Sequence, residues 1–160
     1  MGACESTEQL LRDAEVYNAA GARLAAEGLN LCYHNHEHEL RATFDGVRAL
    51  DVLAEHTDPD AVFFELDIAW VTFGGEDPVR VPHRMAGRVP AIHVKDLWSL
   101  EQRGCFTAVG TGVVKVKDAV QAAIDTGVEW VVVEQDELHN LTAFDTIALS
   151  YLYLREAGLV

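Results

Sequence analysis

Short apolar runs alternate with amphipathic segments along the whole chain, and this alternation limits the possible folds more than any other feature. Strands are predicted where the apolar runs lie, over residues 29–36, 61–67, 90–96 and 129–134. Helices are predicted from the 3.6-residue spacing and the capping residues over 8–27, 44–56, from 77 to just before 87, 117–126 and 142–157. A helix followed by four strand–helix units is typical of a parallel sheet covered by helices.

The chain is predicted to form one domain, residues 1–160. No segment rich in proline, glycine and serine interrupts the alternation, so nothing in the sequence marks a linker. A chain of 160 residues with 49% hydrophobic side chains is long enough to bury a core of its own. We therefore expect an α/β fold of the parallel (β/α) barrel type.

Charge and cysteine content exclude several classes of partner. The chain has 26 acidic and 12 basic residues, a net charge of -14, whereas proteins that bind nucleic acid need a basic surface. No apolar run approaches the roughly 20 residues that cross a membrane, and the polar N-terminus does not resemble a secretory signal. Three widely spaced cysteines do not suggest a disulfide framework. These features predict a cytoplasmic protein without nucleic-acid or membrane partners.

Polar side chains gather at the carboxyl ends of the predicted strands. Because side chains alternate between the two faces of a strand, one face of each strand is apolar and the other is polar near its end. Ligands of parallel α/β folds bind at this end of the strands. The inward-facing residues that should converge there are His34, Asp67, His93 and Glu134.

Two imidazoles and two carboxylates form a suitable ligand set for one divalent cation. Manganese, cobalt, zinc and iron suit such mixed nitrogen and oxygen ligands, and magnesium suits them less well. The alternative is that the histidines and carboxylates only satisfy one another by hydrogen bonds. Four polar strand ends in register favour the metal site, because unpaired buried charge is costly.

Six short motifs carry a resemblance to a known family. In order along the chain they are YHNH with Glu39, ELD-x-x-W, DP, GRVP, HVKD and VEQD. Together they resemble the sugar phosphate isomerase/epimerase family of the xylose-isomerase-like TIM barrels. That resemblance implies a (β/α)8 barrel with one divalent metal at its C-terminal mouth. The four strand–helix units correspond to about half of such a barrel, the C-terminal half.

The resemblance also implies a metal-ligand set of Glu, Asp, His and Glu. Carried over, these positions fall on His34, Asp67, His93 and Glu134, so a histidine stands where many epimerases have a glutamate. His36 and Glu39 remain alternative first ligands. Because that glutamate is one of two acid/base groups in the epimerases, its replacement favours related lyase, dehydratase or 3-keto-sugar chemistry.

We expect a metal-dependent isomerase or epimerase, with a related lyase or dehydratase as the close alternative. Its reaction would be metal-assisted proton transfer next to the carbonyl of a sugar, keto-sugar, sugar phosphate or polyol. Glu134 is the candidate base. Lys95 is the candidate group that protonates or polarises a substrate oxygen; alternatively, it forms an ion pair with Asp67 or Glu65. The candidate substrate contacts are His36, Glu39, Trp70 and Arg103, with packing at the rim as the alternative for Trp70.

Two other functions remain as alternatives. A DNA-repair enzyme similar to endonuclease IV shares the barrel superfamily, but it requires three zinc ions and a basic face. A half-barrel can also be catalytically inert, or serve as a subunit that binds a partner. Four strands in an open sheet leave both outer strands unpaired. We therefore expect a homo-oligomer, or completion of the barrel by another chain.

Overall fold

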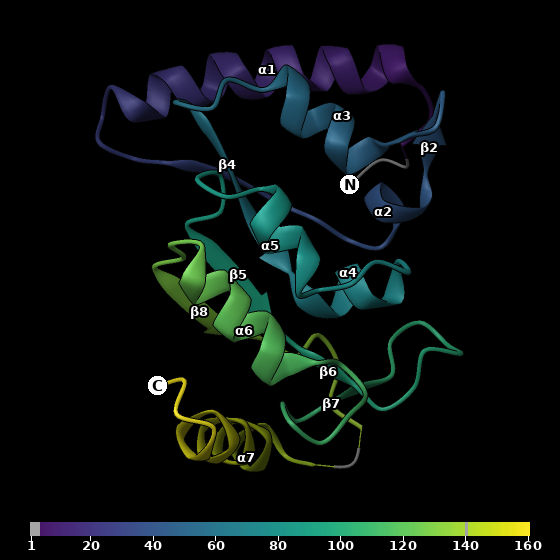
Figure 1. The fold of residues 1–160 in the computed structure, drawn as a ribbon, viewed down its shortest axis with the longest axis vertical. Helices are drawn as coiled ribbons and strands as arrows, with labels where there is room; N and C mark the ends of the chain where they lie inside the picture. Colours follow the sequence, from purple (N-terminus) through teal and green to yellow (C-terminus); the bar gives the residue numbers. More distant parts are fainter. Residues whose placement is uncertain (1–3, 140) are drawn as a thin grey trace.

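The computed structural model describes residues 4–139 and 141–160 and has a parallel sheet at its centre (Figure 1). The strands of this sheet, in spatial order, are β1 (Leu31–His34), β4 (Val62–Asp67), β5 (Ala91–Val94) and β8 (Trp130–Val133). Every neighbouring pair is parallel. The predicted parallel α/β arrangement is confirmed.

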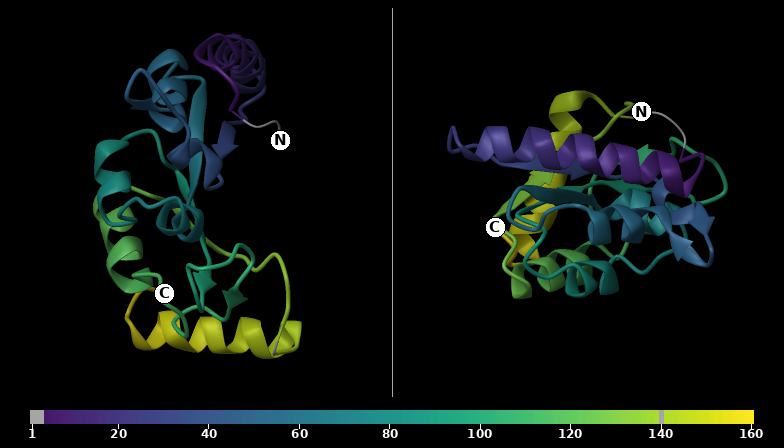
Figure 2. Two further views of the ribbon diagram at one scale, coloured as in Figure 1. Left: turned by 90° about the vertical axis from the view of Figure 1, so that its right-hand side faces the viewer. Right: turned by 90° about the horizontal axis from the view of Figure 1, so that it is seen from above.

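Helices lie between the strands of the sheet and at both ends of the described chain. Three of them, with 19, 8 and 10 residues, are α1 (Thr7–Ala25), α3 (Ala49–His56) and α6 (Val116–Asp125). Three shorter helices are α2 (His38–Arg41), α4 (Ile68–Phe73) and α5 (Arg80–Arg84), and α7 (Ala143–Glu156) ends the fold. In Figure 2, left, α5 and α6 lie on one side of the sheet, and α1 and α7 lie at opposite ends of the molecule.

The two faces of the sheet differ in burial, as the alternation of the sequence predicts. On β4 the side chains of Val62, Phe64 and Leu66 are buried among the helices, whereas Phe63 and Glu65 between them are partly exposed. Parallel pairing places Asp67 directly opposite His93 at the carboxyl ends of β4 and β5. One face therefore holds the apolar core, and the other carries the polar strand ends.

The predicted helix over 44–56 is wrong in its first part. Residues Thr43–Phe44 (β2) and Val47–Arg48 (β3) form an antiparallel hairpin, and helix α3 begins only at Ala49. The two turn residues, Asp45 and Gly46, have φ angles of 51° and 83°. An Asp-Gly pair is a strong signal for such a two-residue turn, because both positions need positive φ.

The segment after β4 also differs from the prediction. Helix α4 begins immediately after Asp67, whose side-chain Oδ1 accepts hydrogen bonds from the backbone N–H groups of Ala69 and Trp70, both at 2.9 Å. The helix that was expected to start near residue 77 is the short α5, because the Asp77 side chain first closes a turn with the N–H of Val79.

The long connection after β5 is partly ordered by pairing. Strand β6 (Asp96–Leu97) pairs antiparallel with β7 (Phe106–Thr107), within a segment that the sequence predicts as a strand end and a polar loop. The buried Asp96 carboxylate accepts backbone hydrogen bonds from Leu97, Gly110, Gly112 and Val114. This one carboxylate therefore holds the start and the end of the connection together, next to the carboxyl ends of the strands.

The described residues contain no helix long and apolar enough to span a bilayer. Cys4, Cys32 and Cys105 are free thiols.

Candidate metal and catalytic site

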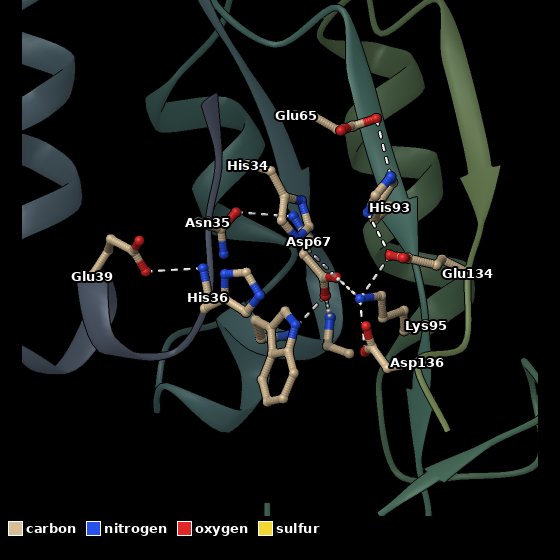
Figure 3. A network of polar contacts seen from close by, with 12 residues as sticks. His34, Asn35, His36, Glu39, Glu65, Asp67, His93, Lys95, Glu134 and Asp136 are labelled. Carbon is tan, nitrogen blue, oxygen red and sulfur yellow. Dashed lines mark hydrogen bonds and ion pairs between the residues drawn. The ribbon is translucent and has the colours of Figure 1, made fainter. Parts of the chain in front are cut away.

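The four predicted ligands lie together at the carboxyl ends of the four parallel strands. His34 ends β1, Asp67 ends β4, His93 lies on β5, and Glu134 follows β8 directly. Each offers one nitrogen or oxygen atom, and these atoms all lie within 4.8 Å of one another. Figure 3 shows the side chains pointing into one space from neighbouring strands.

Asp67 is the most rigidly held member of the cluster. Its side chain is fully buried, and its Oδ1 caps helix α4. Its backbone N–H donates a 2.9 Å hydrogen bond to the side-chain oxygen of Asn35, which is itself fully buried. These contacts leave Oδ2 as the atom that faces the cluster.

His93 lies between two carboxylates. Its Nε2 is 3.1 Å from Oε1 of Glu65, and its Nδ1 is 2.8 Å from Oε2 of Glu134. A metal-binding histidine commonly has a carboxylate on its second ring nitrogen, which fixes the orientation and the tautomer of the ring. Glu65 is therefore placed to orient His93.

Lys95 lies at the base of the cluster with 1% of its surface exposed. Its Nζ lies 3.1 Å from Asp67, 2.7 Å from Glu134 and 2.9 Å from Asp136. Of the two ion pairs considered as the alternative role of Lys95, the pair with Asp67 is present, whereas Glu65 contacts His93 instead. Burial lowers the pKa of Lys95, but the three carboxylates outweigh that effect and raise the pKa above its usual value.

Burial shifts the protonation of two of the four ligands. It raises the pKa of Asp67 to about 6, against the opposing effect of Lys95. It lowers the pKa of His34 to about 4, together with the nearby His93 and His36. At neutral pH, His34 is therefore an uncharged imidazole, the form that binds a metal.

The cluster fits a divalent cation because each ligand has an unsatisfied atom. Within the described residues, buried atoms without a hydrogen-bond partner include His34 Nδ1, Asp67 Oδ2, His93 Nδ1 and Glu134 Oε2. Lys95 lies within ion-pair distance of both carboxylates, but its aligned hydrogen bond is to Asp136. Two nitrogen and two oxygen ligand atoms, none of them in an aligned hydrogen bond, suit manganese, cobalt, zinc or iron.

The candidate substrate contacts divide into two groups. His36, Trp70 and Arg103 form a wall beside the cluster: the rings of His36 and Trp70 are 5.5 Å apart, and the Arg103 guanidinium lies 4.5 Å above the Trp70 ring. Trp70 is 2% exposed, so its side chain is packed in the protein interior as well as forming part of this wall. Glu39 is fully buried and turned away from the cluster, with its Oε2 bound to the backbone N–H of His36 (Figure 3).

Two residues at the site had no role in the sequence analysis. Asp136 binds Lys95, and Asn35 fixes the backbone of Asp67. Both lie one or two residues past a metal-ligand position, in the HN and EQD motifs. Polar residues that closely follow a ligand position in the sequence are the signal that could have identified both as parts of the site.

The fold and the cluster define a parallel α/β scaffold with a candidate metal centre at the carboxyl ends of its strands. Residues 2–150 match the family model described as xylose isomerase-like TIM barrel, so the chain belongs to that family.

Among its relatives, the chain is 31% identical over 155 residues to the inosose dehydratase of Geobacillus kaustophilus, an alignment covering 83% of the chain and 49% of that protein. It is 29% identical over 136 residues to the inosose dehydratase of Geobacillus thermodenitrificans, covering 75% of the chain and 45% of that protein. The chain thus spans about half the length of these curated relatives.

A solved structure supports the same conclusion about the fold. The crystal structure of a sugar phosphate isomerase/epimerase from Parabacteroides distasonis superposes with a TM-score of 0.87 and 25% identity, covering 100% of this chain and 56% of that one. The predicted half of a TIM barrel is therefore confirmed.

Proposed function

We propose that this chain provides the metal-binding half of an enzyme that removes a proton next to the carbonyl of a sugar or cyclitol. The convergence of His34, Asp67, His93 and Glu134, whose ligand atoms all lie within 4.8 Å of one another, is the observation that carries the proposal. Membership of the xylose isomerase-like family and the names of the relatives support the substrate class.

Those four residues would hold one divalent cation. Bound there, the cation would act as a Lewis acid on a substrate carbonyl and acidify the adjacent C–H bond. Two further groups at the cluster are proposed to act on the substrate: the second oxygen of Glu134, and the ammonium group of Lys95, which contacts Glu134. Glu134 is 40% exposed, so its carboxylate reaches the open face, where a substrate would lie.

Glu134 is the proposed base. Its carboxylate would take the proton from the carbon next to the carbonyl, and the electron pair of that C–H bond would move toward the carbonyl oxygen. Lys95 Nζ, 2.7 Å from Glu134, would supply a proton to a substrate oxygen at the same site. In a dehydration this proton would leave with the β-hydroxyl group as water.

Dehydration is the form of this chemistry that the sequence favours. His34 replaces the glutamate that would serve as the second acid/base group of a 3-epimerase, so the described cluster has one carboxylate base at its exposed edge rather than two. Several similar proteins are named inosose dehydratases. An inosose, which is a cyclitol ketone, is therefore the first substrate to test, and keto-sugars and their phosphates follow.

The wall formed by His36, Trp70 and Arg103 is proposed to contact the substrate. Arg103 is held by Glu37 at 2.7 Å and stacks on Trp70, so its remaining guanidinium nitrogens are available to substrate oxygens. His36 lies between Trp70 and His34 and is placed to hydrogen-bond a hydroxyl group. Glu39, being buried behind this wall, would act on the substrate only by fixing the backbone at His36.

The test is proton exchange in D2O. The chain loaded with Mn²⁺ or Co²⁺ is incubated with an inosose, and deuterium incorporation and water loss are followed by NMR and mass spectrometry. Glu134→Gln should lower exchange by roughly two to four orders of magnitude, the usual range for a general base. Glu129→Gln is the matched control, because Glu129 is exposed at the opposite end of β8.

Each outcome of this experiment separates the alternatives. Exchange without water loss would indicate an isomerase or epimerase. A chain that binds metal but exchanges none of the ketones would be an inert half-barrel or a partner-binding subunit, and the proposal would fail. Binding of three zinc ions with cleavage of abasic DNA would indicate the endonuclease-like alternative.

A further inference from the structure

A second group of metal-ligating side chains lies outside the proposed active site. Cys4 precedes helix α1, and His38 and Glu39 begin helix α2. Each offers one ligand atom, and these atoms all lie within 4.8 Å of one another. The group shares no residue with the first cluster, and it joins two segments that are more than thirty residues apart in the sequence.

Glu39 is a buried carboxylate without a permanent cation. It has no exposed surface, and within the described residues its ion-pair partner is His38, whose Nε2 lies 3.0 Å from Oε1. That nitrogen has no aligned hydrogen bond. A bound cation would offset the charge of this carboxylate, because no lysine or arginine among the described residues lies within ion-pair distance of it.

The position of Glu39 is nevertheless fixed by other groups. The Tyr33 hydroxyl donates a 2.5 Å hydrogen bond to Oε1, and the backbone N–H of His36 donates a 2.9 Å hydrogen bond to Oε2. Metal-binding carboxylates are commonly oriented by such outer contacts. The carboxylate is therefore held in one orientation toward the Cys4 thiol and the His38 ring.

Cys4 also lies at an accessible point. A pocket of about 210 Å³ beside it is lined by Cys4, Asp13, Tyr17 and Tyr33, among others. Burial and the charges of Glu39 and Asp13 raise the pKa of the Cys4 thiol to about 11, so the thiol stays protonated when no cation is bound. The same negative surroundings favour a cation at this point.

We propose that Cys4, His38 and Glu39 form a second metal site, selective for a thiophilic divalent cation such as Zn²⁺ or Co²⁺. Binding would replace the thiol proton, which passes to solvent, with a sulfur–metal bond. Thiolate, imidazole and carboxylate are the ligand types of zinc sites that keep one open position. The cation would pin the segment before α1 to α2.

The first site contains no sulfur ligand, and this difference makes the proposal testable independently of catalysis. Co²⁺ bound to a thiolate gives a charge-transfer absorption in the near ultraviolet, whereas Co²⁺ bound to nitrogen and oxygen alone does not. The reduced chain is titrated anaerobically with CoCl2. We expect this absorption in the unmodified chain and in His93→Ala, and its loss in Cys4→Ser and His38→Ala.

Cys32→Ser is the matched control, because Cys32 is a partly buried thiol that lies outside the group. Absence of the sulfur absorption in the unmodified chain, or its survival in Cys4→Ser, would overturn the proposal. Should Cys4→Ser fail to fold, alkylation of the unmodified chain by iodoacetamide gives the answer. Zn²⁺ should slow labelling of Cys4 at least tenfold and leave Cys32 unchanged, as mapped by peptide mass spectrometry; equal rates would contradict the site.

Discussion

The centre of the sheet is much more deeply buried than its β8 edge. In β4 and β5, Phe64 and Ile92 have no exposed surface. At the other extreme, Trp130 of β8 is 67% exposed and Phe144 of α7 is 86% exposed. Helix α7 leaves an apolar pocket of about 450 Å³ between itself and β8, lined mainly by valine, isoleucine, leucine and tyrosine side chains.

This difference divides the candidate site. Asp67 and Lys95 come from the central strands and are almost completely buried, whereas Glu134 and Asp136 follow the edge strand and are 40% and 37% exposed. The centre therefore supplies fixed geometry, and the edge supplies groups that can reach a substrate. Since rigid support is what holds a site to its productive geometry, the edge is where we expect an additional covering surface to matter most.

The largest expected effect tests whether the centre or the edge governs metal binding. His93→Ala and Asp67→Ala should each abolish tight Mn²⁺ binding, measured by electron paramagnetic resonance, because each removes a strong donor from a four-ligand set. His34→Ala, at the β1 edge, should do the same. Full affinity in His34→Ala combined with loss in His36→Ala or Glu39→Ala would reassign the first ligand.

The next effect is a pair of opposed pH dependences in metal-free buffer. Burial raises the pKa of Asp67 from 3.8 to about 6, so its contribution to stability is present below about pH 4 and is lost as pH rises through 6. Burial lowers the pKa of His34 from 6.5 to about 4, so the folded state loses stability as pH falls from 6.5 toward 4.

The two slopes nearly cancel in the unmodified chain, and variants should separate them. In Asp67→Asn the free energy of unfolding should rise by up to about 3 kcal/mol between pH 4 and 6.5, and in His34→Gln it should fall over the same interval. Urea unfolding at several pH values measures both slopes. Identical pH profiles for the two variants would show that burial does not control these groups.

Two valines that face each other across the last strand pair compare the two regions directly. Val94 of β5 is completely buried, and its pairing partner Val133 of β8 is 37% exposed. Val94→Ala should cost about 2–3 kcal/mol of unfolding free energy, and Val133→Ala less than about 1 kcal/mol, because only the first substitution leaves a cavity in a packed core. Equal losses in urea denaturation would mean that the β8 edge is covered in solution.

A smaller effect should follow from the residue that orients His93. Glu65→Gln keeps the size of the side chain but removes the charge that lies 3.1 Å from His93 Nε2. We expect Mn²⁺ affinity to fall about 10- to 100-fold, the usual range for such outer contacts, without loss of the folded state by circular dichroism. Glu129→Gln should bind Mn²⁺ normally. A normal affinity in Glu65→Gln would show that Glu134 alone positions the ring.

The sequence predicts the centre of this molecule better than its connections. The four strands and the convergence of His34, Asp67, His93 and Glu134 follow from two-residue alternation, which translates directly into faces of a sheet. The hairpin at Asp45 and Gly46 was missed because the helical spacing of the following residues was extended too far toward the N-terminus. Helix α4 was missed because it is only six residues long and depends on the Asp67 cap.

Contacts between residues distant in the sequence explain the rest. The burial of Glu39 depends on the Tyr33 hydroxyl and on the turn after β1, so its type and spacing alone favoured an open substrate contact. Lys95 meets Asp136 across the β5–β8 boundary, forty-one positions away. Alternation predicts the face of the sheet on which a side chain lies. How deeply its charged group is buried depends on packing between distant segments, which a single sequence does not show.

The last prediction concerns assembly, for which we expect a substitution to change the oligomeric state while leaving the free energy of unfolding almost unchanged. Both outer strands, β1 and β8, have an edge without a strand partner among the described residues, and Phe144 of α7 is an exposed aromatic side chain. We therefore expect light scattering at micromolar concentration to give a mass above that of one 17.6 kDa chain.

Phe144→Ser should move the mass toward one chain while changing unfolding free energy in dilute solution by no more than about 0.5 kcal/mol, because the side chain is 86% exposed. Lys117→Ser, which alters an exposed side chain on α6, should leave the mass unchanged. A single 17.6 kDa species of the unmodified chain that unfolds cooperatively on heating would show instead that the open edges need no cover.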